Sequence, residues 1–424
     1  MLQALPQPPG LRHALRSLRH RNYRLFFGGQ LISLTGTWMQ NVAQSWLVYR
    51  LTGSEALLGL VGFAGLIPVF LLAPFGGAIA DRADRRRVLI ATQAASLLTA
   101  LFLATLTLSG TVTVWHVVVA AVALGIVNAV DIPTRQAFVP SLVSGEDLSN
   151  AIALNSTIFN GARIVGPAVA GVVLAAVGEG WCFAANAASF LAVIVGLVWI
   201  VVPRRATDRR SLSTMARIAE GFRFSWGHVP IRAILLLVGV VSLTGMPYTV
   251  LMPVFAERIL HGGPGSLGLL MAAAGCGALA GSLLLASRRE LPGLGLWIAV
   301  APAGFGASLV LFSLSRALWL SAAVLVGAGF TLIVQMASSN TLVQTMVPDE
   351  LRGRVMSVYS MMFLGMAPFG SLLAGALAER VGAPATVAAG GAVCMVASAL
   401  LGRRIPSLVE ATRRVEAPSH NPAP

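Results

Sequence analysis

The residues of this chain that could carry chemistry are few, and they stand apart from one another. Charged residues make up 11% of the 424 residues, whereas soluble proteins carry about 25%. The six histidines and three cysteines show no spacing typical of a metal site or a redox pair. A membrane enzyme would need His, Asp or Ser clustered at a membrane face, and His261 beside two glycines is too weak a cluster. We therefore expect no metal, no cofactor and no enzymatic activity.

Arg163 and Asp131 stand out among the charges that lie in apolar stretches. A charge inside a membrane is costly and usually marks a substrate or ion path. Arg163 must contact carbonyls or amides, reach Asp131, or meet an anion from outside the protein. A structural role and a substrate contact are equally supported for it. If Arg163 has no acidic partner, an anionic substrate is favoured, because a carrier of cationic drugs would be expected to have a carboxylate in its cavity. Asp131 is the membrane acid available as a proton carrier.

A second group of candidates is polar but uncharged. Gln40 and Gln44 are four residues apart, so they share a helix face, with Asn41 beside them. We expect these amides to line a cavity, and the alternative is a hydrogen bond between helices. Gln335, Tyr359 and Met362 are further candidate substrate contacts, because methionine forms an adaptable surface for bulky apolar ligands. A row of methionines is also common in ordinary packing.

These residues must be positioned by membrane helices. Hydrophobic residues make up 56% of the chain, and the mean hydropathy is +0.79. A helix that crosses a bilayer needs about 20 apolar residues. Twelve such windows occur, at residues 25–49, 56–80, 88–109, 113–137, 151–177, 181–202, 233–256, 266–287, 293–314, 317–343, 354–378 and 383–402. The predicted fold is an all-α membrane protein with twelve transmembrane helices.

The arginines predict the orientation. All 30 basic residues are arginine, and 25 of them fall in the tails and alternate loops that share one side with the N-terminus. Positive charge gathers on the cytoplasmic side of membrane proteins. The protein is therefore expected in the cytoplasmic membrane, with both termini in the cytoplasm. The net charge of +14 would suggest nucleic acid in a soluble protein. Here it is explained by orientation, and no nucleic-acid partner is expected.

The chain divides at its midpoint. Residues 203–232 are the only long polar stretch inside the chain, and two weakly similar acidic turns, at 143–148 and 347–351, lie about 200 residues apart. Such a duplication is typical of transporters that bind substrate between two halves. The predicted parts are a cytoplasmic tail (1–24), a six-helix bundle (25–202), a cytoplasmic loop (203–232), a second six-helix bundle (233–402) and a cytoplasmic tail (403–424).

The loop after the second window reads Gly77-Ala-Ile-Ala-Asp81-Arg82-Ala-Asp84-Arg85-Arg-Arg87. It resembles the G-x-x-x-D-R-x-x-R-R signature of the major facilitator superfamily, which usually has glycine where this chain has Asp84. The resemblance implies two pseudo-symmetric six-helix bundles. It also implies a conformational latch that holds the cytoplasmic ends closed, made here by Gly77, Asp81, Arg82, Arg85 and Asp131. In this latch the carboxylate of Asp81 accepts hydrogen bonds from the N-terminus of span eleven. The alternative is a charge cluster that only sets topology.

Two further stretches narrow the resemblance. Gly166-Pro167-Ala-Val-Ala-Gly171 in span five is similar to the Gly-Pro signature of superfamily antiporters, although ordinary helix packing explains it equally well. Residues 21–26, 36–40, 43–49 and 348–355 resemble the enterobactin-exporter-like branch of efflux carriers, which includes drug exporters. The resemblance implies a monomer that exports an amphiphilic compound, a siderophore or a drug, by alternating access and proton antiport. Import, lipid or metabolite exchange, and a non-transporting assembly role are the alternatives.

Overall fold

The computed structural model describes residues 15–201, 214–287 and 294–402. Every regular element in these ranges is a helix, as predicted. The expected C-terminal tail (403–424), the first 14 residues of the expected N-terminal tail and residues 203–213 of the expected central loop lie outside the described residues.

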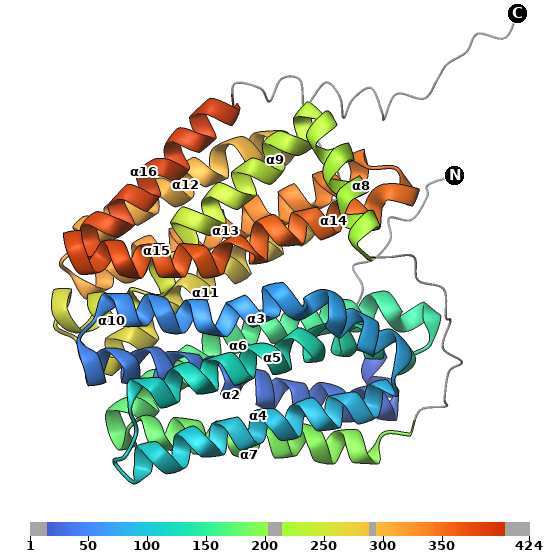
Figure 1. Ribbon diagram of the computed structural model, residues 1–424, viewed down its shortest axis with the longest axis horizontal. Helices are drawn as coiled ribbons and strands as arrows, with labels where there is room; N and C mark the ends of the chain where they lie inside the picture. Colours follow the sequence, from blue (N-terminus) through green and yellow to red (C-terminus); the bar gives the residue numbers. More distant parts are fainter. Residues whose placement is uncertain (1–14, 202–213, 288–293, 403–424) are drawn as a thin grey trace, which may run out of the picture.

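The first half of the chain forms one bundle of six long helices, at the bottom of Figure 1. A short 3-10 helix, η1 (Arg16–Arg19), precedes it, and two more, η2 (Val139–Ser141) and η3 (Gly145–Asp147), connect its fourth and fifth helices. The long helices are α2 (Arg21–Thr52), α3 (Glu55–Arg82), α4 (Arg85–Leu108), α5 (Val114–Phe138), α6 (Leu148–Val177) and α7 (Glu179–Trp199).

The second half forms the upper bundle of Figure 1. Its first span is a run of short pieces: α9 (Val229–Val240), the π-helical turn η4 (Val241–Gly245), the 3-10 turn η5 (Met246–Thr249), α10 (Met252–Val254) and the π-helical turn η6 (Phe255–Ile259). The remaining helices are α11 (Gly263–Ser287), α12 (Leu294–Leu314), α13 (Leu318–Met346), α14 (Asp349–Leu364), α15 (Met366–Val381) and α16 (Ala383–Gly402).

Eleven helical segments in the described residues are long and apolar enough to cross a membrane. The run from α9 to η6 and the pair α14–α15 each count as one segment. α2 is not among the eleven, because Gln30, Gln40, Asn41 and Gln44 lower its hydropathy. It is 32 residues long and packs in the bundle against α6 and α7. With α2, the number of spans agrees with the predicted twelve.

Two features of the C-terminal half differ from the prediction. The window 233–256 reads as one uninterrupted helix, yet the helix is broken at Gly245–Thr249, because Pro247 and Pro253 lack the N–H that continues an α-helix. The stretch 203–232, expected as a loop, contains the helix α8 (Thr214–Gly227). α8 packs on α14, and Arg354 Nη1 lies 2.5 Å from Glu220 Oε1. A short amphipathic helix is polar overall, so a hydropathy window reads it as loop.

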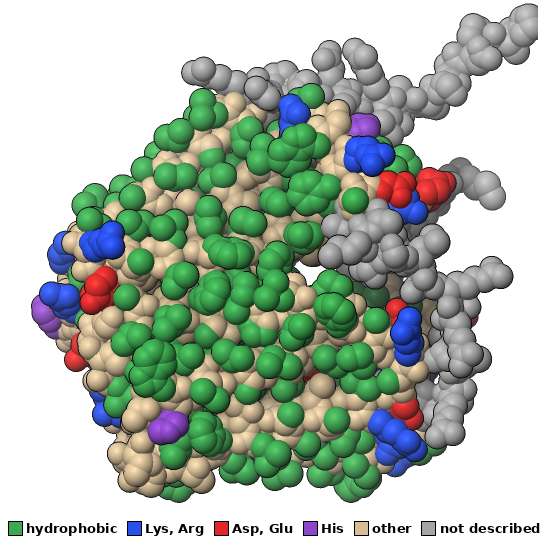
Figure 2. Space-filling view, viewed as in Figure 1, with side chains coloured by type: hydrophobic (Ala, Val, Ile, Leu, Met, Phe, Trp, Pro, Cys, Tyr) green, Lys and Arg blue, Asp and Glu red, His purple; other side chains and the backbone are tan. Residues whose placement is uncertain are grey.

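The bundles contact each other at one end and diverge at the other. Most of the contacts between them join α3 to α15 and α6 to α11. We call the end with the turns at Gly53, Gly178 and Gly382 the closed end, and the end with Asp81 and Asp349 the open end. In Figure 1 the bundles approach at the left and separate toward the right, and Figure 2 shows an opening between them on that right-hand side.

Small residues allow the approach at the closed end. A Cβ added to Gly375 would lie 2.7 Å from the Cα of Gly59, and one added to Gly268 would lie 2.7 Å from the Cα of Gly171. Real Cβ atoms do not come this close to backbone. Glycine at these four positions is therefore what brings the two bundles into backbone contact.

Candidate functional site

One ion pair and one helix cap join the two bundles at the closed end. Glu379 of α15 accepts hydrogen bonds on Oε2 from Ser54 Oγ and Ala56 N, both at 3.0 Å. These donors stand at the N-terminus of α3, where the helix dipole favours an anion. Arg258 of η6 lies beside Glu55 of α3, with Nη1 and Oε1 3.4 Å apart. Both interactions cross from one bundle to the other, so they stabilise the closed end.

The predicted latch residues at the open end do not bridge the bundles. Asp81 is exposed, and its carboxylate forms no ion pair or hydrogen bond with another described residue. Cβ atoms added to Gly77 or Gly353 would meet nothing within 4 Å. Asp84 instead caps α4 by accepting bonds from Arg86 N and Arg87 N at 3.1 and 3.3 Å. The departure from the usual glycine at this position therefore has a local explanation.

The arginines of the same loop bind the carbonyl ends of helices. Arg85 donates to Ala80 O at 3.1 Å and to Ala137 O at 3.0 Å, which joins the ends of α3 and α5. Arg86 donates to two carbonyls in the last turn of α7, at 2.6 and 2.5 Å. Cations at helix C-termini complement the dipole. Arg82 is exposed. In this conformation the loop ties together three helices of one bundle.

Asp131 is buried in the N-terminal bundle, and its partners differ from the predicted ones. Its Oδ1 accepts from Thr92 Oγ1 at 2.7 Å and from Gln93 Nε2 at 2.9 Å. Its Oδ2 lies 3.4 Å from Arg135 Nη2, one turn along the same helix. The expected bridge from Asp131 to Arg85 is not formed, because Arg85 uses its donors on helix-end carbonyls. Arg135 takes that place, since residues four apart share a helix face.

The three candidate amides of α2, Gln40, Asn41 and Gln44, have different surroundings. Gln40 is 2% exposed and accepts a hydrogen bond from Asn186 Nδ2 at 2.6 Å, inside the N-terminal bundle. For Gln40 the cavity interpretation is corrected in favour of the alternative, a hydrogen bond between helices. Asn41 is exposed and Gln44 is half-buried. The spacing of these residues predicts a common helix face. It does not predict which neighbouring helix that face of α2 contacts.

The C-terminal candidates lie largely within their own bundle. Gln335 is fully buried, and neither atom of its amide has a hydrogen-bond partner. Tyr359 is 4% exposed and donates from its hydroxyl to Met336 O at 2.9 Å. Met362 is half-buried, and its Sδ would lie 3.4 Å from a Cβ on Gly239 of α9. Gln335 and Tyr359 therefore do not face the opening in this conformation, in contrast to the expectation that they contact substrate.

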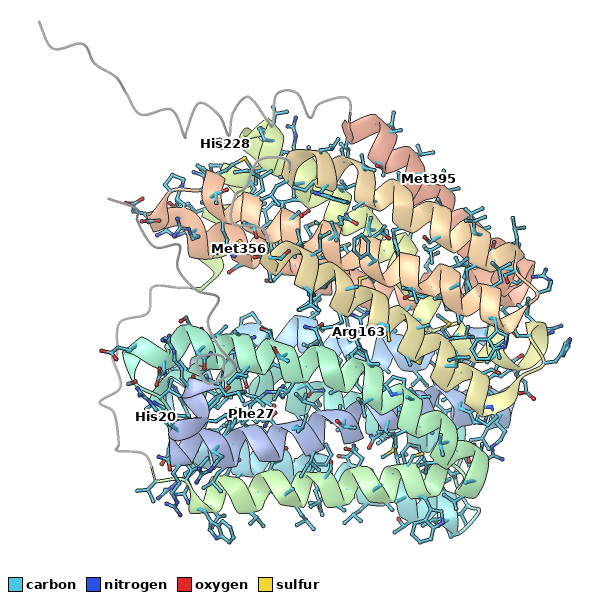
Figure 3. All side chains as sticks on the ribbon, turned by 180° about the vertical axis from the view of Figure 1, so that it is seen from behind. His20, Phe27, Arg163, His228, Met356 and Met395 are labelled. Carbon is cyan, nitrogen blue, oxygen red and sulfur yellow. The ribbon has the colours of Figure 1, made fainter. Side chains whose placement is uncertain are left out.

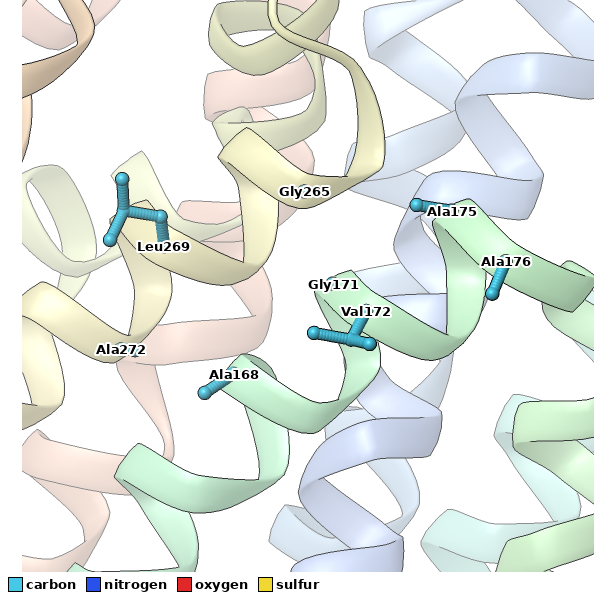
Figure 4. Close-up of a pocket in the computed structure, with 8 residues that line it drawn as sticks. All are labelled: Ala168, Gly171, Val172, Ala175, Ala176, Gly265, Leu269 and Ala272. Atoms are coloured by element: carbon cyan, nitrogen blue, oxygen red, sulfur yellow. The ribbon is translucent and has the colours of Figure 1, made fainter.

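The Gly-Pro segment of α6 makes contacts within its own bundle and with the other bundle. Gly166 packs against Trp38 of α2 within one bundle, whereas Gly171 meets Gly268 of α11 across the two bundles. Beside this crossing lies a shallow apolar groove of about 560 Å³ (Figure 4). Its lining comes from α6 and α11: Ala168, Gly171, Val172, Ala175, Ala176, Gly265, Leu269 and Ala272. The segment therefore has a clear packing role.

Arg163 lies where the closed part of the interface gives way to the opening. Its carbonyl oxygen would be 3.0 Å from a Cβ on Gly275 of α11, so the backbones of the two bundles still touch at this point. Its side chain points into the space between the bundles (Figure 3), with Cζ 5.8 Å from the centre of the Trp38 ring. None of the carboxylates in the described residues forms an ion pair with it.

Tyr248 is a candidate that the sequence reading missed. It stands in η5, at the break in the first span of the C-terminal bundle, and is 2% exposed. Its buried hydroxyl has no hydrogen-bond partner among the described residues. The signal that could have found it is the run Gly245-Met-Pro247-Tyr248, because glycine and proline inside a membrane span mark a discontinuous helix.

Comparison with known proteins identifies the family and several relatives of named function. The family described as transmembrane secretion effectors matches residues 13–424. A staphyloferrin A transporter from Staphylococcus aureus is 30% identical over 366 residues, which cover 85% of this chain and 90% of that protein. The multidrug efflux pump Tap from Mycolicibacterium fortuitum is 30% identical, covering 81% and 86%. Macrolide efflux protein A from Streptococcus pyogenes is 23% identical, covering 86% and 92%.

Solved structures agree on the fold. A bacterial homologue of the human lysosomal transporter Spinster, in an inward-facing and unoccupied conformation, superposes with a TM-score of 0.71 at 15% identity, covering 92% of this chain and 98% of that one. A bacterial homologue of the iron transporter ferroportin, in an inward-facing state, gives 0.68 at 15% identity with the same coverage. At such low identity, these similarities establish the architecture alone.

Proposed function

Because this chain belongs to the transmembrane secretion effector family of major facilitator transporters, we propose that it exports an amphiphilic organic compound across the cytoplasmic membrane by alternating access and proton antiport. The family and its relatives are transporters and not enzymes, so a small-molecule substrate and a membrane setting follow directly. Two of the relatives are named for efflux of drugs, which supports export over import.

The observation that carries alternating access is the contrast between the two ends of the bundle interface. At the closed end, glycines are in backbone contact across the bundles, and an added Cβ would clash. At the open end, Gly77 of α3 and Gly353 of α14 have free space around them. Glycine in a helix costs up to about 1 kcal/mol relative to alanine. In a second conformation α3 and α14 would approach each other closely, and glycine at these two positions would allow that approach.

The closed end also suggests how the latch works. There, Glu379 of α15 caps the N-terminus of α3. At the closed end an acid of the C-terminal bundle caps a helix of the N-terminal bundle. At the open end the acid, Asp81, belongs to the N-terminal bundle, and the helix without a side-chain cap, α14, belongs to the C-terminal bundle. An anion at a helix N-terminus is stabilising. In the proposed second conformation Asp81 therefore caps α14, and Arg82, Arg85 and Asp131 hold the loop in position.

The substrate enters from the open end in this proposal. That end carries Arg82, Arg85, Arg86 and Arg87, so the positive-inside rule assigns it to the cytoplasm, together with both termini. Asn41, Gln44 and Met362 are partly or fully exposed and remain candidate contacts. Asp131 is proposed as the proton carrier, although its bonds to Thr92, Gln93 and Arg135 must then change during the cycle. The unit that transports is proposed to be a monomer.

The test uses everted membrane vesicles that hold a respiration-driven pH gradient. Organic anions, macrolides and lipophilic cations are added in turn, and dissipation of the gradient is followed by the fluorescence of a weak base. Vesicles from cells with an empty vector are the control. We expect at least one class to dissipate the gradient only when the protein is present. Equal traces in both kinds of vesicle across the panel would refute proton-coupled export.

A further inference from the structure

We infer that the outer face of α8 binds the head groups of anionic phospholipids at the surface of the membrane, through Arg223 and Arg232 on either side of Trp226. Neither the motifs nor the comparisons assign a role to this helix. The inference goes beyond the proposed function and needs no transported substrate. It takes from the proposed function only the assignment of the open end to the cytoplasm.

α8 lies at the level of the bilayer surface. It ends at Gly227, two residues before the membrane-crossing segment Val229–Ile259 begins. In Figure 1 it runs across the direction of the long helices, at the open end and in front of α14. A short helix in this position lies along a bilayer and does not cross it. The last turn of α8 therefore stands at the depth of the phospholipid head groups.

The two sides of α8 have different surroundings. One side packs on α14, because a Cβ added to Gly221 would lie 2.5 Å from the carbonyl oxygen of Arg354. On the other side, Ala219, Arg223 and Trp226 follow one another at steps of four and three residues, so they share a helix face. All three are exposed, and 47% of Trp226 is accessible. We call this the outer face of α8.

The outer face carries positive charge that nothing in α8 offsets. Arg223 is exposed and forms no ion pair or hydrogen bond with another described residue. Arg232 donates from Nη1 to the carbonyl oxygen of Trp226 at 3.2 Å, so a second guanidinium lies beside this residue. The one acid of α8, Glu220, is paired with Arg354 of α14 at 2.5 Å. The charge of the outer face is therefore complementary to an anionic surface.

The combination of arginine and tryptophan indicates a lipid. A guanidinium offers a planar pair of donors that matches the oxygens of a phosphate. An indole prefers the boundary between head groups and acyl chains, because one part of it is apolar and its N–H is polar. The ring of Trp226 is held in place by stacking on Phe222 at a centroid distance of 6.0 Å. A phospholipid offers both a phosphate and an apolar chain, whereas a soluble anion would leave the exposed indole without a partner.

A lipid at this place would act on α14. α8 is fastened to that helix by the backbone contact at Gly221 and by the pair between Glu220 and Arg354. The start of α14 is the part that approaches α3 in the proposed second conformation. A ligand shifts a conformational equilibrium by its difference in affinity between the two states. α8 therefore provides a route by which the lipid composition reaches the open end.

The test uses the purified full-length protein in nanodiscs, with the three native cysteines replaced and a nitrobenzoxadiazole fluorophore attached at Ala219→Cys. Ala219 lies on the outer face, one turn from Arg223. The nanodiscs contain phosphatidylglycerol or phosphatidylcholine that carries a nitroxide near the head group, on the same acyl chains. Quenching at several lipid ratios gives the preference for phosphatidylglycerol beside the label. Both leaflets have one composition, so the result does not depend on the orientation of the protein.

The variants are Arg223→Gln and Arg223→Lys. Arg21→Gln is the matched control, because Arg21 is also exposed at the open end and forms no ion pair or side-chain hydrogen bond with another described residue, but it belongs to the other bundle. Since one arginine near a bilayer surface favours an anionic lipid about fivefold, we expect the parent protein to prefer phosphatidylglycerol by at least this factor.

Arg223→Gln should lower the preference about fivefold, whereas Arg223→Lys should keep it, because the charge remains. Arg21→Gln should leave it within about twofold. Arg223→Gln should also leave the melting temperature unchanged, because the side chain is not bonded to another described residue.

Three results would overturn the inference. A label that neither lipid quenches would mean that the outer face meets water. Equal quenching by the two lipids in the parent protein would mean that the face does not select anions. An equal loss of preference in Arg21→Gln and Arg223→Gln would assign the effect to net charge and not to a site on α8. None of these results bears on transport, which the vesicle assay tests separately.

Discussion

The contact between Gly59 and the C-terminal bundle allows a quantitative test of alternating access. A Cβ added to Gly59 would lie 2.5 Å from the carbonyl oxygen of Ser371 and 2.8 Å from the Cα of Gly375. Both neighbours are backbone atoms, so no change of side-chain rotamer relieves the clash. Ordinary contacts of a Cβ begin at 3.4 Å, so the Gly59→Ala variant must part the bundles by roughly 1 Å at this point.

The energy of this clash applies to one conformation only. Overpacking costs about 1–3 kcal/mol. In this variant it destabilises only the conformation in which the two bundles touch at Gly59. A difference of this size changes the ratio of two conformations by about 5- to 150-fold. We therefore expect Gly59→Ala to shift the population toward a state that separates the closed end and brings the open end together.

Double electron–electron resonance measures this shift directly, on a background in which the three native cysteines are replaced. Spin labels at Ser109 and Leu314 report the closed end, and labels at Arg87 and Asp349 report the open end; all four positions are exposed. In Gly59→Ala the first distance should lengthen and the second should shorten.

Gly65→Ala is the matched control for this experiment. It lies in the same helix, and its added Cβ would meet only Ala121 of the same bundle, at 3.9 Å. It should leave both distance distributions as in the parent protein. If Gly59→Ala folds normally and also leaves both distributions unchanged, the closed end is not a gate and the reasoning from the glycines is refuted.

Two further predictions concern the acids of the N-terminal bundle. Asp81→Asn should express and fold normally yet transport slowly, because an uncharged side chain caps α14 less favourably in the proposed second state; wild-type rates in vesicles would mean that the motif only sets topology. Asp131→Asn should abolish dissipation of the pH gradient by substrate while exchange of labelled substrate across the membrane continues, because the protein then lacks its proposed proton carrier; a variant that still dissipates the gradient would exclude Asp131 from coupling.

Some properties of this protein could be predicted from single segments of the sequence. The membrane spans are one example, since the apolar windows agree with the helices to within a few residues at most ends. The class of protein is another, because the motif around Asp81 and the overall resemblance lead to the family that the comparisons identify. These predictions succeed because hydropathy and motif spacing are local properties of a chain, which need no knowledge of which helix packs against which.

The site residues show where this local reasoning ends. Gln40 and Asn41 are neighbours in sequence, yet one is bonded inside the bundle and the other is exposed. Asp131 pairs with Arg135 and not with Arg85, because the capping of α3 and α5 occupies Arg85. Each outcome depends on the rotation of a helix about its own axis, which is set by the neighbours it packs against.

The sequence by itself determined that this chain crosses a membrane many times as helices, because the bilayer requires long apolar segments whose backbone bonds are satisfied internally. It also identified Arg163 as a charge that needs a partner. Only the tertiary structure decided that the backbone of Arg163 meets Gly275 of α11, a residue of the other bundle. That contact arises because the two bundles meet at small residues, and contacts between distant segments leave no periodic signal in the sequence.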